Sequence, residues 1–316
     1  MDDVPIHTGL EQRLGPDHAH RRLAVEAGHE ARCFGQGLSF FDVERWYSIH
    51  SMIRTTLRLC GLYRRACRNA GLVELRHHTI RLPDLPHAFH GYRLLHLSDL
   101  HADMSEAAME RVVQLLDGVT YDVCVLTGDY RGKTFGPFDA ALTGVARVVA
   151  RLTKPVYGVL GNHDSIRMVP GLEALGVRML LNEAEAIERD GARIHLAGID
   201  DAHFFLAHDI GKAAAAIPTG ETAILLSHTP EVYLEAANAG FAVLLAGHTH
   251  GGQLCLPGGM PITLDSNLPR RFGVGAWRFG ALTGYTSVGA GSSLVAVRLN
   301  CRPEITLHRL ERAPAQ

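Results

Sequence analysis

Five short segments of the sequence carry side chains that suit metal chemistry. They are SDLH (98–101), TGDY (127–130), GNHD (161–164), SHTP (227–230) and LAGHTHGGQ (245–253). Each segment alone is weak evidence, because Asp and His in loops are usually solvated turn residues. Together they supply carboxylate, amide and imidazole groups, and this mixture of oxygen and nitrogen donors suits a pair of divalent transition ions. The sequence therefore predicts a site for two metal ions.

The candidate ligands share one position in the predicted secondary structure. Each of them follows a short apolar run that is typical of a buried strand: Asp99, Asp129, Asn162, His228 and His248. In open α/β sheets the loops beyond the carboxyl ends of the strands converge on one crevice. We therefore expect these residues to meet at one site, although they are distant in sequence.

Short apolar runs alternate with helical patterns in the larger, C-terminal part of the chain. The predicted strands are 92–98, 123–127, 156–160, 223–227 and 241–246, and the predicted helices are 105–116, 140–152, 210–216 and 231–239. This alternation indicates parallel strands joined by right-handed crossovers. A hairpin is expected at 185–196, and antiparallel strands are expected at 294–300 and 304–310. The pattern predicts an α/β fold with two sheets and flanking helices.

The order of the five segments resembles the calcineurin-like metallophosphoesterase superfamily. The form GHTHGGQ, with SHTP upstream, is similar to its branch of bacterial phosphodiesterases and UDP-2,3-diacylglucosamine hydrolases of the membrane-peripheral type. The similarity covers roughly residues 92–310. It implies a four-layer α-β-β-α sandwich, in which two mixed sheets are flanked by helices. We therefore expect a catalytic domain at 86–316 and an N-terminal helical extension at 1–85.

The resemblance also implies which residues bind the ions. By matching positions, the ligands are Asp99, His101 and His250 for the first ion, Asn162, His228 and His248 for the second, and Asp129 as the bridge between them. Such ions sit roughly 3.5–4 Å apart and clamp the attacking and leaving oxygens, and a hydroxide that bridges them would be the nucleophile. Manganese is the expected metal, with iron or zinc as alternatives, because mixed oxygen and nitrogen ligands do not select strongly among them.

Two residues next to a ligand are candidates for catalysis. His163 follows Asn162, and in the family the matching histidine protonates the leaving group or steadies the transition state. Asp164 would orient His163 by a hydrogen bond. The alternative for Asp164 is a capping role at the start of the helix that follows.

The family pattern is not matched at one position. Many family members have an Arg three or four residues after Gly-Asp, whereas the segment GDYRGK places Arg131 two residues after Asp129. Arg131 and Lys133 are therefore both candidates for contact with the substrate phosphate, and each is alternatively an exposed loop charge.

For other residues we expect roles that do not involve the metals. His96 lies inside a predicted strand and is expected to be a satisfied core histidine. His195 and His208 are expected at the surface. The segment GIDDAHFFLAHD (198–209) follows a strand and could overhang the site. Its two adjacent phenylalanines are either part of the core or a grip for an acyl chain or a base.

The N-terminal part differs in composition from the rest. Residues 1–41 show no clear period and are expected to form a poorly ordered or loosely packed arm. From Asp42 to about Ala70 the pattern is helical, with a break at Gly61. The predicted apolar face holds Trp46, Ile49, Ile53, Leu57 and Cys60, and the opposite face holds Arg54, Arg58 and Arg65.

This helical segment is strongly basic. The stretch from Arg45 to Arg81 has eight Arg, no Lys and one Glu, a charge of +7, whereas the whole chain has −2. One interpretation is a helix that packs on the domain with a solvated Arg face. The other is an interfacial segment at 42–81 that rests on anionic lipid, where apolar burial and basic charge act together.

Composition limits the class of protein. With 47% hydrophobic and 20% charged residues, the chain is typical of globular proteins. It contains no run of about 18 apolar residues, and its acidic start is not a secretory signal. Its six cysteines form no C-x-x-C pair, so reduced thiols are expected. We expect a cytoplasmic protein, with or without peripheral contact at the inner face of the membrane.

The leading hypothesis for function is a phosphodiesterase or pyrophosphate hydrolase with a lipid-linked or nucleotide-sugar substrate. A phosphomonoesterase, including a protein phosphatase, is the first alternative, because the same metal centre serves both. A non-catalytic binding scaffold is the second, although it would be expected to have lost ligands. The basic segment contains Trp46, Tyr47 and Tyr63, but no recognised nucleic-acid motif accompanies it.

Overall fold

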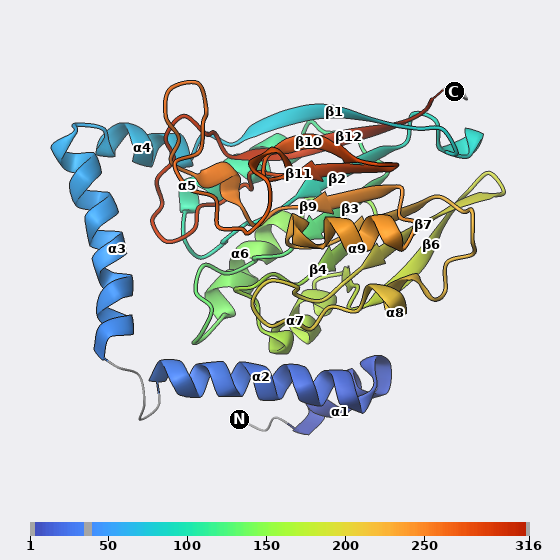
Figure 1. Ribbon diagram of the computed structural model, residues 1–316, viewed down its shortest axis with the longest axis horizontal. Helices are drawn as coiled ribbons and strands as arrows, with labels where there is room; N and C mark the ends of the chain where they lie inside the picture. Colours follow the sequence, from blue (N-terminus) through green and yellow to red (C-terminus); the bar gives the residue numbers. More distant parts are fainter. Residues whose placement is uncertain (1–3, 35–39, 314–316) are drawn as a thin grey trace.

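The computed structural model describes residues 4–34 and 40–313, and of residues 4–8, 30–34 and 40–49 it describes the helical backbone alone. Two six-stranded sheets lie face to face, and helices cover the outer face of each (Figure 1). The expected α/β fold, with two mixed sheets flanked by helices, is therefore confirmed.

The first sheet carries three of the candidate metal-binding loops. Its strands, in spatial order, are β1 (Glu74–Leu82), β12 (Glu304–Arg312), β2 (Arg93–Leu97), β3 (Val123–Thr127), β4 (Val156–Val159) and β5 (Val177–Met179). The pairs from β2 to β5 are parallel, as expected for strands joined by helical crossovers. Strand β12 runs antiparallel to β2 and parallel to β1.

The second sheet carries the remaining two loops. Its strands, in spatial order, are β10 (Gly275–Phe279), β11 (Leu282–Thr286), β9 (Val243–Ala246), β8 (Ala223–Leu226), β7 (Ala192–Gly198) and β6 (Glu183–Arg189). Strands β7, β8 and β9 are parallel, and β6 and β7 form the predicted hairpin.

Apolar side chains fill the space between the layers. Between the sheets, Val125, Leu196 and Leu245 belong to one buried cluster, because inward-facing residues of both sheets meet there. The outer face of the first sheet packs on α5 (Glu106–Leu116), α6 (Asp139–Val149) and α7 (Val169–Ala174), and that of the second on α8 (Ile210–Ala214) and α9 (Tyr233–Asn238). Short 3₁₀ turns lie at η1 (His87–Phe89), η2 (Ile166–Met168), η3 (Pro230–Val232), η4 (His250–Gly252) and η5 (Arg270–Phe272).

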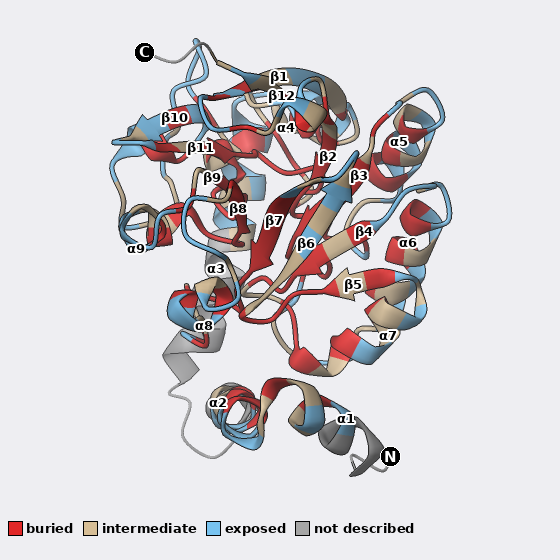
Figure 2. Ribbon diagram, turned by 90° about the vertical axis from the view of Figure 1, so that its right-hand side faces the viewer, coloured by how far each residue is buried: buried red, intermediate tan, exposed pale blue. Residues whose placement is uncertain are grey.

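The expectation of a loosely packed N-terminal arm is wrong for residues 4–34. This segment forms two helices, α1 (Val4–Leu14) and α2 (Pro16–Phe34), which lie along one end of the sandwich (Figure 2). Leu10, Leu14 and Leu23 are buried in the same cluster as the first sheet and its helices. The helical spacing of the apolar residues was not recognised, because polar residues between them are also buried, in ion pairs with the domain.

The predicted basic helix is present and is broken where expected. Helix α3 (Phe40–Leu59) and helix α4 (Tyr63–Ala70) are separated at Gly61, whose φ is +69°. Leu57 is buried against Val297, as predicted, whereas Cys60 is exposed, so its assignment to the apolar face is wrong. The side chains of Trp46 and Ile49 lie outside the described residues.

The strand predicted at 294–300 is absent from the described structure. The alternation was real, since Val295 and Val297 are both buried, but they pack on helix α4 instead of forming a sheet. Leu294 has a φ of +60°, which interrupts an extended strand, and the backbone N–H of Arg298 donates to Ala66 of α4.

Strand β1 was not predicted. It precedes the domain boundary expected at residue 85, yet it pairs with β12 in the first sheet.

Among the described helices, none has the length and apolar character needed to cross a membrane.

Candidate metal centre

The candidate ligands lie just beyond the carboxyl ends of strands from both sheets. Asp99 and Asp129 follow β2 and β3 of the first sheet, and His228 and His248 follow β8 and β9 of the second. The two sets are in contact, because the backbone N–H of His248 donates to Asp99 Oδ1 at 3.1 Å. The expected convergence at strand ends is therefore observed.

A first group of candidate ligands is buried and compact. Ligand atoms of Asp99, His101, Asp129 and His250 all lie within 4.8 Å of one another. The Nε2 atoms of His101 and His250 are 3.1 Å apart, and Nε2 of His250 is 3.5 Å from Asp99 Oδ1. These are separations expected for ligands that share one ion.

A second group lies on the other side of Asp129. The side-chain oxygen of Asn162 is 2.9 Å from His228 Nε2 and 2.8 Å from His248 Nδ1. Asp129 Oδ2 is 3.3 Å from His228 Nε2 and 3.7 Å from His101 Nε2 of the first group. One carboxylate oxygen therefore lies close to both groups.

The donor set fits divalent ions. Burial raises the pKa of Asp99, so the carboxylate gains from a nearby cation. Burial opposes the charged form of His228 as well, yet the Asp129 carboxylate raises the pKa of that imidazole to about 10. Both shifts show that the buried carboxylates favour a positive charge beside them, and divalent ions would supply it.

The second ring nitrogen of two imidazoles is fixed by a backbone carbonyl. His101 Nδ1 donates to the carbonyl of Arg131 at 2.8 Å, and His228 Nδ1 donates to that of Thr127 at 2.7 Å. Such contacts set the tautomer and leave Nε2 with its lone pair toward the site.

The backbone is left-handed at most of the candidate ligands. Five of them have positive φ: Asp99 (50°), His101 (39°), Asp129 (56°), His248 (72°) and His250 (49°). Non-glycine residues in this region are strained by roughly 1–3 kcal/mol each and are concentrated at functional sites. Such backbone strain persists only where the surrounding structure imposes it, so its concentration in these loops marks them as a candidate functional site.

Comparison with known proteins assigns the family. Residues 92–252 match the family model described as calcineurin-like phosphoesterase. The chain belongs to this family. It is therefore a metallophosphoesterase, a hydrolase of phosphoric esters whose family uses divalent metals, and its site of Asp99, His101, Asp129 and His250 is in place.

Three relatives show how far the similarity extends. The uncharacterized metallophosphoesterase YkoQ of Bacillus subtilis is 30% identical over 69% of this chain and 83% of its own length. The phosphodiesterase YaeI of Escherichia coli is 28% identical over 69% of this chain and 82% of its own. A transmembrane protein with metallophosphoesterase domain from Danio rerio is 30% identical over 74% of this chain and 56% of its own.

His163 of this metallophosphoesterase lies beside the candidate ligand Asp129. Its Nε2 atom is 3.9 Å from Asp129 Oδ2, and its Nδ1 atom is 2.8 Å from the hydroxyl of Thr134. Burial lowers the pKa of His163 to about 4. Thr134, which no sequence motif indicated, is therefore the group that orients this imidazole.

Asp164 does not act on His163 in the way expected from the sequence. Its carboxylate accepts hydrogen bonds from the backbone N–H groups of Asp129 (2.7 Å), Gly161 (2.8 Å) and Tyr130 (2.9 Å). It is not a helix cap either, because Ser165 caps the turn that follows. Asp164 holds together the two loops that carry Asp129 and Asn162.

Arg131 is a structural residue of its loop. Its guanidinium donates to the carbonyls of His163, Thr134 and Gly136, and only 3% of the residue is exposed. The geometry does not offer it to a substrate phosphate. Lys133 is exposed on the same loop, which agrees with the alternative interpretation of a surface charge.

The histidines outside the motifs have mixed outcomes. His96 is confirmed as a core histidine, since it is fully buried and 2.8 Å from the hydroxyl of Thr127. His195 is only 5% exposed and contacts Glu221, so the expected surface position is wrong. His208 is partly exposed.

The segment 198–209 does reach the candidate metal centre. The ring of His203 lies 4.1 Å from that of His248, and His203 Nδ1 is 2.8 Å from Glu231 Oε2. Sequence reasoning singled out the segment but missed His203 itself. Its position within a loop after a strand was the available signal.

Proposed function

We propose that the protein is a metal-dependent phosphodiesterase or pyrophosphate hydrolase with two divalent ions. Asp99, His101 and His250 would hold one ion, Asn162, His228 and His248 the other, and Asp129 would bridge them. The observation that carries the proposal is the position of Asp129 Oδ2, which is 3.7 Å from His101 Nε2 and 3.3 Å from His228 Nε2.

The bound ions would acidify a water molecule and neutralise charge on the phosphoryl oxygens. The protein supplies orientation and a hydrogen-bond donor. The hydroxyl of Thr134 fixes one nitrogen of His163, so that Nε2 is directed toward the metal side, near Asp129. Because burial keeps this imidazole uncharged at neutral pH, His163 would steady the leaving oxygen in the transition state by a hydrogen bond from Nε2, a contribution of about 10²–10³ in rate.

Diester specificity is favoured by one named relative, the phosphodiesterase YaeI. The test compares hydrolysis of bis-p-nitrophenyl phosphate and p-nitrophenyl phosphate, each in Mn²⁺ and in EDTA. Cleavage of the diester that EDTA abolishes supports the proposal. Cleavage of the monoester alone would assign a phosphomonoesterase, and cleavage of neither would contradict both.

We also propose that helices α3 and α4 rest on anionic lipid, which would give access to a lipid-linked or nucleotide-sugar substrate. Met52 is 62% exposed and Leu59 is 84% exposed, and both lie among exposed arginines of the basic segment. Exposed apolar side chains next to basic charge are typical of interfacial helices. The name of the Danio rerio relative is consistent with a membrane setting.

Point substitutions test this contact better than a deletion, because α1, α2 and β1 are packed into the fold. Vesicles of phosphatidylglycerol and phosphatidylcholine should sediment with the full chain, and the double variant Met52→Ser, Leu59→Ser should lose most of this binding. Leu234→Ser, a change at a 50% exposed position on α9, is the control. If the wild-type protein does not sediment with the vesicles, the proposal is contradicted.

A further inference from the structure

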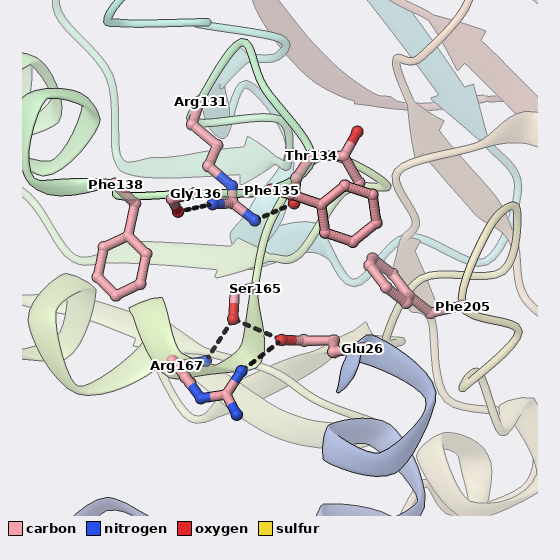
Figure 3. Close-up of a pocket in the computed structure, with 9 residues that line it drawn as sticks. All are labelled: Glu26, Arg131, Thr134, Phe135, Gly136, Phe138, Ser165, Arg167 and Phe205. Carbon is pink, nitrogen blue, oxygen red and sulfur yellow. Dashed lines mark hydrogen bonds and ion pairs between the residues drawn. The ribbon is translucent and has the colours of Figure 1, made fainter. Parts of the chain in front are cut away.

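A pocket with three phenylalanine rings lies beside His163. Its volume is about 250 Å³, and Figure 3 shows Phe138 on one side and Phe135 and Phe205 on the other. Thr134 lines the pocket and also contacts His163 Nδ1 at 2.8 Å. The pocket therefore shares a wall with the proposed catalytic histidine.

Helix α2 contributes Glu26 to the lining of the pocket, at the lower right of the same view. Glu26 of α2 is only 5% exposed, and its carboxylate accepts from the hydroxyl of Ser165 at 2.6 Å and from the backbone N–H of Ile166 at 2.7 Å. Ser165 lies two residues after His163. The N-terminal helices, which the family model does not cover, thus complete a cavity at the candidate active site.

The polar groups at the floor and roof of the pocket are engaged with the protein. Arg131 donates to three carbonyls, and Glu26 accepts from two groups of the loop after His163. Phe135 and Phe138, which are both partly exposed, are therefore the aromatic surface that the pocket presents to a ligand. A planar ring fits such a lining, because aromatic pairs gain from offset or edge-to-face contact beyond apolar burial.

The size of the pocket narrows the ligand further. Sites for whole small molecules usually measure about 300–1,000 Å³, so this cavity takes one part of a substrate. We infer that it is a subsite for a single planar aromatic ring of the phosphate ester, such as an aryl group or a nucleobase. This inference rests on the proposed function, because the phosphate itself would lie at the metal ions.

Two phosphonates isolate the contribution of the ring. Phenylphosphonate and methylphosphonate present the same anionic group, and only the first carries a ring. Titration calorimetry on the Mn²⁺-loaded full chain should show that phenylphosphonate binds about tenfold more tightly. In Phe135→Leu this ratio should fall to about twofold while the affinity for methylphosphonate is unchanged.

The control and the contrary outcomes are defined by the same titration. Phe279→Leu, at another partly buried phenylalanine that packs on the second sheet, should keep the tenfold ratio. Phe138→Leu replaces Phe135→Leu if that variant does not fold. A wild-type ratio of one, or a ratio that neither pocket variant changes, overturns the subsite alone. Binding of neither phosphonate, with no metal-dependent cleavage of the diester, overturns the proposed function and the subsite together.

Discussion

The guanidinium of Arg22 on helix α2 donates to the backbone carbonyl of Asp164 at 3.0 Å. Asp164 in turn accepts from the backbone N–H of Asp129, the residue proposed to bridge the ions. Arg22 also pairs with Asp200 at 3.4 Å and with Glu26 at 2.7 Å, and it lies 3.4 Å over the ring of Phe205. The N-terminal helices are thus tied to the loops of the active site through one buried cation.

Replacement of Arg22 by leucine should destabilise the protein strongly. The change leaves Asp200 and Glu26 buried without this cation, and breaking a buried ion pair in this way costs about 3–5 kcal/mol. Arg21→Leu is the matched control, because Arg21 is exposed on the same turn and its loss should cost no more than about 0.5 kcal/mol. Urea unfolding measures the free energy of unfolding of both variants. Equal values would show that the contacts of Arg22 do not stabilise the packing of α2 on the domain.

Gly247 should be required for the geometry of the first ion site. A Cβ atom at this position would collide with the hydroxyl of Ser98 and with the carboxylate of Asp99. Gly247→Ala should therefore displace Asp99 and reduce Mn²⁺ affinity by roughly 10–100-fold. Gly118→Ala, where no atom lies within 4 Å of the new Cβ, should bind Mn²⁺ as the wild type does. Wild-type affinity in Gly247→Ala would mean that Asp99 is not a ligand.

His163→Ala should lose rate and keep its metals. The uncharged imidazole is proposed to donate a hydrogen bond to the leaving oxygen in the transition state, so the rate of diester cleavage should fall by about 10²–10³. Metal content measured on the same sample separates this effect from damage to the site. A variant that loses its ions as well would place His163 among the ligands instead.

The sequence predicted the convergence of the candidate ligands better than their surroundings. Asp99, Asp129 and the GHTH histidines follow strand ends, where the chain topology alone brings them together. Thr134, His203 and Arg22 act through contacts between segments that are 29 or more residues apart, or through a loop packed on another loop. Side chains with such roles leave no local pattern of spacing.

The same limit applies to the fold. The central parallel strands β2, β3, β4, β8 and β9 were predicted because their apolar runs are buried on both faces. Strand β1 was missed because it lies at the edge of its sheet and its charged and histidine residues hide the alternation. The packing of residues 4–34 on the domain was not predicted, because Arg22 and Glu26 are buried as an ion pair. From composition alone, charged residues of this kind are expected at the surface.

Stability should fall in mild acid because of His96. Burial lowers its pKa to about 3, and it contacts another buried histidine, His308, at 3.3 Å. The unfolded chain, with a pKa near 6.5 for histidine, binds a proton first as the pH falls. The contribution of His96 to the free energy of unfolding is therefore complete above about pH 6.5 and is lost progressively toward pH 3.

Urea unfolding in EDTA at pH 7 and pH 5 measures this slope. His96→Gln should reduce it by up to about 1.4 kcal/mol per pH unit. His87→Gln, a change at an exposed histidine, should leave it as in the wild type. An unchanged slope in His96→Gln would show that another group dominates the acid response.

The central claim is that Asp129 is shared by two ions. It is tested most directly by counting the manganese bound to the full chain and to Asp129→Asn after equilibration with Mn²⁺ and removal of free metal. The account predicts two ions per chain in the wild type, and loss of both ions together with diester cleavage in Asp129→Asn. A single ion in the wild type, or two ions and full activity in Asp129→Asn, would contradict it.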